Sequence, residues 1–277
     1  MSTPPREKPA TTAINLLWLN PVTTTAYNEV FAGMIKAVKR PNVHVDVVSL
    51  DLPGFDITNL ETRAHEAAIW GPVTHVAYHA GKEGYHGMAI PCFYDTALKE
   101  ARTVSGKAIV AAPCEASLKI VSGLCRKFSV VIGVDEWEPQ MRELIREYGY
   151  EDRLVSFTTI GLHVDEFQKD KERTEELISK AVEKAVKGKA EAIILGCTVE
   201  FGFYQVLQDK FDVPVIDAAY ACYKDMEDQA MNSVQFGWSP SRKGGMKPPS
   251  DEEIAKSGIY ARPAPIKGLI SLQRDGE

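Results

Sequence analysis

The stretch Ala89-Ile90-Pro91-Cys92-Phe93-Tyr94-Asp95 decides the fold of this chain, and Ile193-Ile194-Leu195-Gly196-Cys197-Thr198-Val199-Glu200 repeats its plan. In each stretch an apolar run typical of a buried strand ends in a cysteine, after which we expect a helix. Ligands of open α/β sheets bind at the carboxyl ends of the strands. We therefore expect the sheet to deliver Cys92 and Cys197 to a ligand site.

Strands and helices alternate along most of the chain. Short apolar runs predict strands over residues 14–19, 43–50, 87–91, 108–112, 128–134, 154–160, 192–196 and 213–217. Helical periodicity lies between them, most clearly over residues 172–187. The two halves share one order of elements, so the repeat is one of architecture. Alternation of this kind is typical of parallel sheets with helices on both faces.

Three finer predictions follow from local signals. Thr23, Thr24 and Thr25 offer N-caps for the first helix. Pro72 fits the first turn of a helix that begins after another one over residues 61–70. The helix after Cys92 is predicted to cover residues 95–104.

We expect two α/β lobes and two flanking segments. The first lobe is predicted to comprise residues 13–114 with about 216–240, and the second residues 115–215. The C-terminal tail, 241–277, is rich in proline, glycine and charge, with one possible short helix at 251–256. A flexible arm and a strap on a partner subunit both fit this tail. Residues 1–12 are polar and predict a loose arm.

Bulk composition excludes several classes of protein. A net charge of −6 and a pI near 5.6 argue against a dedicated nucleic-acid binder. No apolar run approaches the roughly 18 residues that cross a bilayer, so no membrane partner is expected. The first residues lack the apolar core of a signal peptide, and we therefore expect a cytoplasmic protein.

The five cysteines form an odd set without a CxxC pair, which predicts neither a zinc knuckle nor a dithiol redox motif. Cys125 and Cys222 fit small buried apolar residues. His75 and His79 have the spacing of some metal pairs, but the sequence offers no third ligand nearby. We therefore predict surface histidines there and no metal site.

Two thiols at corresponding strand ends suggest a specific chemistry, although each could be a core residue. At the start of a helix, a thiol is held close to the positive end of the helix dipole, which favours thiolate. If the halves face each other, one thiolate can remove a proton from a carbon while the other thiol protonates the opposite face. Such a two-base racemase acts on a small molecule and needs no cofactor. A cysteine hydrolase is the rival, and it would need His163 or His44 beside a thiol.

Several short motifs in order carry a resemblance to a known family. They are Leu19-Asn20-Pro21, Cys92-Phe93-x-Asp95, Glu115-Ala116-Ser117, Leu195-Gly196-Cys197, Val213-Pro214-Val215-Ile216-Asp217 and the basic segment Ser241-Arg242-Lys243. Over residues 14–242 the chain resembles the aspartate/glutamate/hydantoin racemase superfamily, most of all its hydantoin and allantoin racemases. The resemblance implies an α/β fold of two pseudo-symmetric lobes, each a parallel sheet flanked by helices, with the active site in the cleft between them.

The same resemblance implies roles for individual residues. Cys92 and Cys197 would be the catalytic acid/base pair of a cofactor-independent isomerase, and a homo-oligomer is expected. The residues that would contact substrate are Asn20, Phe93, Tyr94, Glu115, Thr198 and Glu200.

The sequence departs from the family pattern after the second cysteine. Hydantoin racemases usually continue with Ala-Gly, whereas this chain continues with Thr198-Val199-Glu200, which is more like amino-acid racemases. We interpret the chain as a racemase of a 5-substituted hydantoin-like ring. An amino-acid racemase of the Asp/Glu type, a cysteine-dependent isomerase or decarboxylase of the same superfamily, and a non-catalytic binding protein remain the alternatives.

Overall fold

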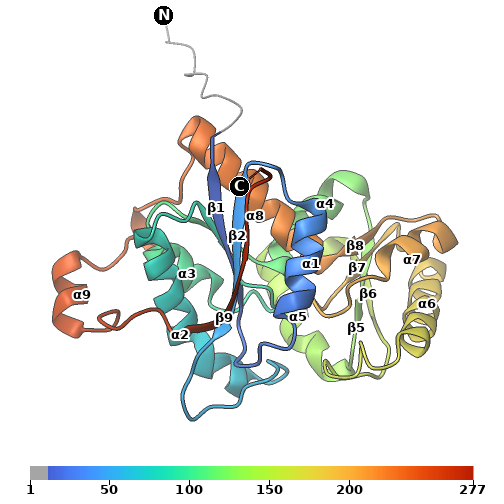
Figure 1. Cartoon of the computed structure of the whole chain (residues 1–277). Coiled ribbons are helices and arrows are strands. Elements are labelled where there is room, and N and C mark those ends of the chain that lie inside the picture. The colour runs from blue at the N-terminus through green and yellow to red at the C-terminus, as the bar shows by residue number, and fades with distance from the viewer. Residues whose placement is uncertain (1–11, 277) are drawn as a thin grey trace, which may run out of the picture. The chain divides into compact units, whose positions relative to one another are not determined.

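The structure, a computed structural model, describes residues 12–276 (Figure 1). Its internal contacts divide the chain into two units. The first unit comprises the chain up to Ile90, Ala97–Ala111 and the chain from Tyr223 onward. The second comprises Pro91–Thr96 and Ala112–Cys222. Apart from Thr12, the predicted N-terminal arm lies outside the described residues.

The first unit is built on a sheet with the strand order β4-β3-β1-β2-β9. Its strands are β1 (Ile14–Asn20), β2 (Val43–Leu50), β3 (Gly87–Ala89), β4 (Ile109–Ala111) and β9 (Ile266–Leu272). The pairs β1–β2, β1–β3 and β3–β4 are parallel. Because β1 and β2 are almost entirely buried, they form the core of this unit.

The first unit also contains helices. They are α1 (Asn28–Val38), α2 (Arg63–Lys82), α3 (Leu98–Val104), α9 (Asp251–Ser257) and the larger part of α8 (Ala218–Phe236). Helix α1 contacts β2 and β9, whereas α2 and α3 contact each other and the strands β3 and β4, respectively. No helix within residues 12–276 is long and apolar enough to cross a membrane.

The second unit has a fully parallel sheet with the order β6-β5-β7-β8. Its strands are β5 (Phe128–Ile132), β6 (Leu154–Thr159), β7 (Ala192–Leu195) and β8 (Val215–Asp217), and its helices are α4 (Pro113–Leu124), α5 (Glu138–Glu147), α6 (Lys171–Lys187) and α7 (Tyr204–Phe211). Helix α6 lies against β5, β6 and β7 and beside α7 (Figure 1). The predicted α/β fold with parallel sheets flanked by helices is confirmed.

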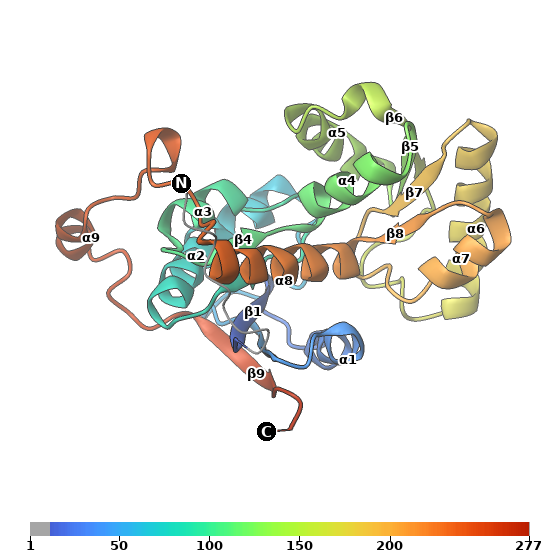
Figure 2. The same cartoon turned by 90° about the horizontal axis from the view of Figure 1, so that it is seen from above.

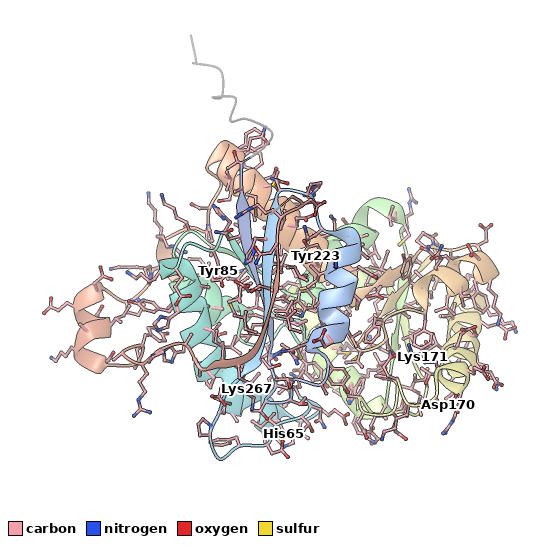
Figure 3. The ribbon with its side chains drawn as sticks, in the orientation of Figure 1. His65, Tyr85, Asp170, Lys171, Tyr223 and Lys267 are labelled. Atoms are coloured by element: carbon pink, nitrogen blue, oxygen red, sulfur yellow. The ribbon has the colours of Figure 1, made fainter. Side chains whose placement is uncertain are left out.

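Helix α6 shows how closely a local pattern can determine an element. Asp170 (Figure 3) caps the helix by accepting the Arg173 N–H at 3.0 Å. The buried face carries Ile178, Ala181, Val182 and Ala185. The pairs Glu176–Lys180 and Glu183–Lys187, each four residues apart, lie on the outer face at 2.6 and 2.7 Å.

The prediction of two helices around Pro72 is wrong, because α2 runs unbroken from Arg63 to Lys82. A proline in a helix removes the hydrogen bond to the carbonyl four residues earlier, here that of Ala68. Ala68 is exposed, so water can solvate this carbonyl and the helix continues. The helix begins at Arg63, close to the start predicted at residue 61. The Thr62 side chain caps it by accepting the N–H of His65 (Figure 3).

The threonine caps predicted for α1 are also wrong. The helix begins after Tyr27, without a side-chain cap. The Thr23 hydroxyl instead bonds to Ile57, accepting its N–H at 2.8 Å and donating to its carbonyl at 3.1 Å. The Thr23 hydroxyl therefore bonds to a residue distant in sequence instead of capping the helix, as the local pattern predicted.

One strand in the tail, β9, is not predicted by the sequence pattern. Strand β9 pairs antiparallel with β2, at the edge of the sheet (Figure 2). A bulge interrupts the pairing between Val47 and Ser49, where Gly268 has φ +66° and its carbonyl accepts the Asn28 side-chain N–H at 2.9 Å. The flexible-arm alternative is therefore wrong for residues 266–272.

Candidate functional site

Both predicted thiols lie at the first position of a tight turn. The Asp95 N–H donates to the Cys92 carbonyl at 2.8 Å, and the Glu200 N–H donates to the Cys197 carbonyl at 3.0 Å. Each turn therefore has the form Cys-x-x-acid, with the acidic residue at the same position. Both turns belong to the second unit.

Each cysteine is the one solvent-accessible residue of a buried segment. Residues 87–98 are buried apart from Cys92, and residues 192–200 are buried apart from Cys197. Cys114 and Cys222 are buried, as predicted for Cys222, whereas Cys125 is partly exposed. The turns thus expose their sulfur-bearing residues and cover the rest.

A hydrogen bond joins the two turns. The Thr198 hydroxyl donates to the Pro91 carbonyl at 2.9 Å, across 107 positions of sequence. Thr198 follows Cys197 and Pro91 precedes Cys92, so the contact brings the two cysteine-bearing segments side by side. The bond is buried, which makes it costly to break.

The carboxyl group of Asp95 braces the first turn against α4. It accepts the N–H groups of Cys114 and Glu115 at 2.8 and 2.9 Å, and the Tyr148 hydroxyl at 2.8 Å. Asp95 therefore caps the start of α4 from a distant part of the sequence. Burial raises the pKa of Asp95 to about 7, although these three hydrogen bonds act to lower it.

The carboxyl group of Glu200 braces the second turn differently. Its Oε2 accepts the Cys197 N–H at 3.2 Å, while Oε1 is buried without a hydrogen-bond partner among the described residues. Burial raises the pKa of Glu200 well above its ordinary value, and the charge of Asp217 raises it further. Asp217, at the end of β8, accepts the N–H groups of Ala219 and Tyr220.

The prediction that each cysteine lies at the start of a helix is wrong. The helices after the two turns begin only at Leu98 and Tyr204, so neither cysteine occupies the first turn of a helix. Asp95 and Ala97 have φ of +48° and +54°, a left-handed conformation that delays the start of α3. Instead of a helix N-terminus, a hydroxyl contacts the first sulfur: Thr96 Oγ1 donates to Cys92 Sγ at 3.8 Å.

Comparison with known proteins places this arrangement in a family. The family model described as Asp/Glu/Hydantoin racemase matches residues 16–225. The chain belongs to the Asp/Glu/hydantoin racemase family. The match covers the strands that precede both cysteine turns, and it ends within α8, before the tail.

The relatives of this racemase-family chain are themselves racemases. It is similar to a hydantoin racemase of Pseudomonas sp. (strain NS671), 28% identical over 85% of this chain and 92% of the relative. It is 31% identical to a hydantoin racemase of Rhizobium meliloti, over 76% and 86%. The fold is similar to that of an allantoin racemase from Klebsiella pneumoniae, with a TM-score of 0.78, 24% identity, and coverage of 86% and 95%. The chain is therefore a hydantoin racemase-like enzyme of the isomerase class.

The other predicted site residues fall into different surroundings. In the second unit, Phe93 and Tyr94 are 3% and 9% exposed, whereas Glu115 is more open and pairs with Lys119 at 2.9 Å. Asn20 belongs to the first unit, where its side-chain N–H donates to the Ser49 hydroxyl at 3.2 Å. Contact of these residues with substrate stays a prediction.

Two groups singled out by the sequence have other uses in the racemase-family fold. The Nε2 atoms of His75 and His79 each lie 2.9 Å from the Arg262 carbonyl, so this pair fastens the tail to α2. Burial raises the pKa of the Cys114 thiol well above its ordinary value, with contributions from Asp95 and Glu115. Cys114 is therefore a poor candidate for a third nucleophile.

Three residues of this site were not predicted from the sequence. Thr96 contacts the sulfur of Cys92, and Tyr148 contacts the carboxyl group of Asp95. The third, Asp217, contacts the start of α8. An acid follows each cysteine by the same number of residues, but this signal marks Asp95 and Glu200 and none of these three. Nothing local marked Tyr148, because it reaches Asp95 across 53 positions.

Proposed function

We propose that this enzyme interconverts the enantiomers of a 5-substituted hydantoin-like ring, using Cys92 and Cys197 as the proton-transfer pair. One thiolate takes the proton from the ring carbon next to the carbonyl, which leaves an enolate-like intermediate. The other thiol gives its proton to the opposite face of that carbon, and the two groups exchange roles in the reverse direction. No atoms other than protons are transferred, so the mechanism requires no cofactor.

The Thr198–Pro91 hydrogen bond carries this proposal, because it holds the two cysteine-bearing segments together within one unit. The exposure pattern supports it, since each thiol is the accessible residue of a buried segment. A cysteine with only a structural role would not need to be accessible to solvent. The similarity to hydantoin racemases of two bacteria supports the class of substrate.

The use of Thr198 favours a ring over an amino acid. A threonine at this position would help an amino-acid racemase by donating a hydrogen bond to the substrate carboxylate. Here the hydroxyl has one proton, and it is already donated to the Pro91 carbonyl. A hydantoin also has the more acidic α-hydrogen, so two thiols suffice with less stabilisation of the intermediate.

The decisive experiment follows hydrogen exchange and racemisation together. Single enantiomers of 5-substituted hydantoins, aspartate and glutamate are incubated with the enzyme in D2O, while NMR records α-deuteration and polarimetry records loss of rotation. We expect hydantoins to react and Cys92→Ser or Cys197→Ser to slow racemisation by about 10²- to 10⁴-fold. Cys125→Ser, which removes another partly exposed thiol, is the matched control.

Each single variant offers a sharper test. A variant with one remaining thiol should exchange the α-hydrogen of one enantiomer with retention of configuration, and should do so much faster than it racemises that enantiomer. Racemisation at the wild-type rate by either variant would rule out the two-thiol mechanism. Reaction of aspartate or glutamate alone would favour the amino-acid racemase. Light scattering of the full chain tests the expected homo-oligomer, which stays a prediction.

A further inference from the structure

The carboxyl group of Glu200 is completely enclosed, although it lies three residues from an accessible thiol. Glu200 has 0% exposed surface, and its backbone and side chain both bond to Cys197. One carboxyl oxygen, Oε1, has no hydrogen-bond partner among the described residues. A residue in this position is poorly suited to contact a substrate directly.

Asp217 is the charged group that acts on Glu200. Its Oδ1 accepts two N–H groups at the start of α8, at 2.9 and 3.2 Å, while Oδ2 is buried without a hydrogen-bond partner in the described chain. Within residues 12–276, no cationic side chain offsets the burial of Glu200: the influences on it are desolvation, two backbone N–H groups and the charge of Asp217. Burial raises the pKa of Asp217 itself only to about 6.

Two buried carboxyl groups that influence each other do not both ionise at neutral pH. The helix N-terminus stabilises the anion on Asp217, so the proton remains with Glu200. Oε1 of Glu200 accepts no hydrogen bond that would stabilise a negative charge on it, so it is the oxygen suited to carry the proton. The neutral form therefore avoids the cost of burying a charge that no cationic side chain compensates.

We propose that Glu200 is a positioning residue: a neutral carboxylic acid that holds the Cys197 turn and leaves the nearby thiol free to ionise. The inference rests on the proposed function for the importance of Cys197, and on geometry for the state of Glu200. A second full negative charge within the turn would oppose formation of the Cys197 thiolate. A neutral acid keeps the hydrogen bond to the Cys197 N–H without that repulsion.

The test measures charge without using any substrate. The alkylation rate of Cys197 by iodoacetamide is recorded between pH 6 and 10 by mass spectrometry, with Cys125 as an internal reference. Glu200→Gln keeps the shape and an oxygen acceptor but cannot ionise. If Glu200 is already neutral, the pH midpoint of Cys197 alkylation should shift by less than about 0.3 units, which is a twofold change in thiolate fraction.

Asp217→Asn calibrates the assay, because it removes the group that we assign as the anion. This variant should lower the pH midpoint of Cys197 alkylation, which would show that the Cys197 thiol responds to a charge at position 217. If Glu200→Gln lowers the midpoint by about one unit or more, Glu200 is an anion and the proposal is wrong. If Asp217→Asn leaves the midpoint unchanged, the assigned anion is wrong.

Stability gives a second readout. Because the folded-state pKa of Glu200 lies above its unfolded value, its contribution is full at low pH and is lost as pH rises through the folded-state pKa. The melting temperature of Glu200→Gln should therefore fall less between pH 6 and pH 9 than that of the wild type. Glu176→Gln, an exposed acid on α6, is the control and should keep the wild-type slope.

Failure of the two proposals can be told apart. If no candidate ring exchanges its hydrogen, the proposed function fails, while the alkylation profiles still report the state of Glu200. If the rings racemise but Glu200→Gln moves the alkylation midpoint, the function stands and the positioning role fails.

Discussion

The two cysteine turns share a backbone and differ in what their acids do. In both, the residue three positions after the cysteine donates its N–H to the cysteine carbonyl, at 2.8 and 3.0 Å. Asp95 turns its carboxyl group away, toward two N–H groups of α4 and a tyrosine hydroxyl. Glu200 turns its carboxyl group back to its own cysteine. One acid therefore fastens its turn to a neighbouring helix, and the other fixes the turn itself.

The difference follows from side-chain length and from available donors. Asp95 finds the free N–H groups that every helix start presents, because α4 begins beside it. At the second turn, the start of α8 is already capped by Asp217. Glu200 is longer and can fold back onto the Cys197 N–H. Burial acts on both acids in the same direction: it raises the pKa of Asp95 to about 7 and that of Glu200 well above its ordinary value.

Removal of the Asp95 carboxyl group should have the largest effect on the fold. Asp95→Ala leaves two N–H groups of α4 and the Tyr148 hydroxyl without their acceptor, so the free energy of unfolding should fall by about 3 kcal/mol or more. Urea unfolding followed by circular dichroism measures this. Asp209→Ala, at an exposed position on α7, is the control. A loss no greater than that of the control would contradict the bracing role.

Loss of the bond between the two turns should have the next largest effect. Thr198→Val keeps the shape but leaves the buried Pro91 carbonyl without its donor, which should lower the free energy of unfolding by about 2 kcal/mol. Thr198→Ser keeps the hydroxyl and should lose less than half as much. Racemisation should fall with Thr198→Val, because the separation of the thiols is no longer fixed. Equal stability of the valine and serine variants would show that the bond contributes little.

Tyr148→Phe should have the smallest effect, and it should depend on pH. The hydroxyl donates to Asp95 at 2.8 Å, and a hydrogen bond to a charged acceptor is worth more than one to a neutral acceptor. Since the pKa of Asp95 is about 7, the loss in unfolding free energy should grow from below about 1 kcal/mol at pH 5.5 to about 2 kcal/mol at pH 8.5. Tyr150→Phe is the control. A loss that did not change with pH would mean that Asp95 keeps one protonation state across this range.

The pH dependence of the whole unit follows from the same groups. Asp95 and Asp217 have folded-state pKa values of about 7 and about 6, above their ordinary values. Groups of this kind contribute most stability below their unfolded pKa, and the contribution is lost as pH rises through the folded value. The second unit should therefore lose stability between about pH 4 and pH 7, which is the opposite of the usual effect of ion-paired acids.

The sequence predicted the elements well where a local pattern was sufficient. The apolar runs and the stripe of α6 marked their elements because backbone conformation and burial of one face are encoded by neighbouring residues. Prediction failed where a distant group intervened. Thr23 bonds to Ile57, and β9 needs β2 as a partner. Helix α2 continues through Pro72 for a different reason: the carbonyl that loses its hydrogen bond belongs to the exposed Ala68. The delay of α3 after Cys92 depends on left-handed residues that no local preference demands.

The sequence by itself determined the alternating α/β plan, the pair of strand-end cysteines and the repeated spacing of an acid after each. Only the tertiary structure decided which thiols are accessible, that Thr198 reaches Pro91 across 107 positions, and that the two acids have unlike partners. The physical reason is that strand and helix patterns arise from neighbouring residues. The pKa of a buried acid depends instead on donors and charges that folding brings to it from elsewhere in the chain.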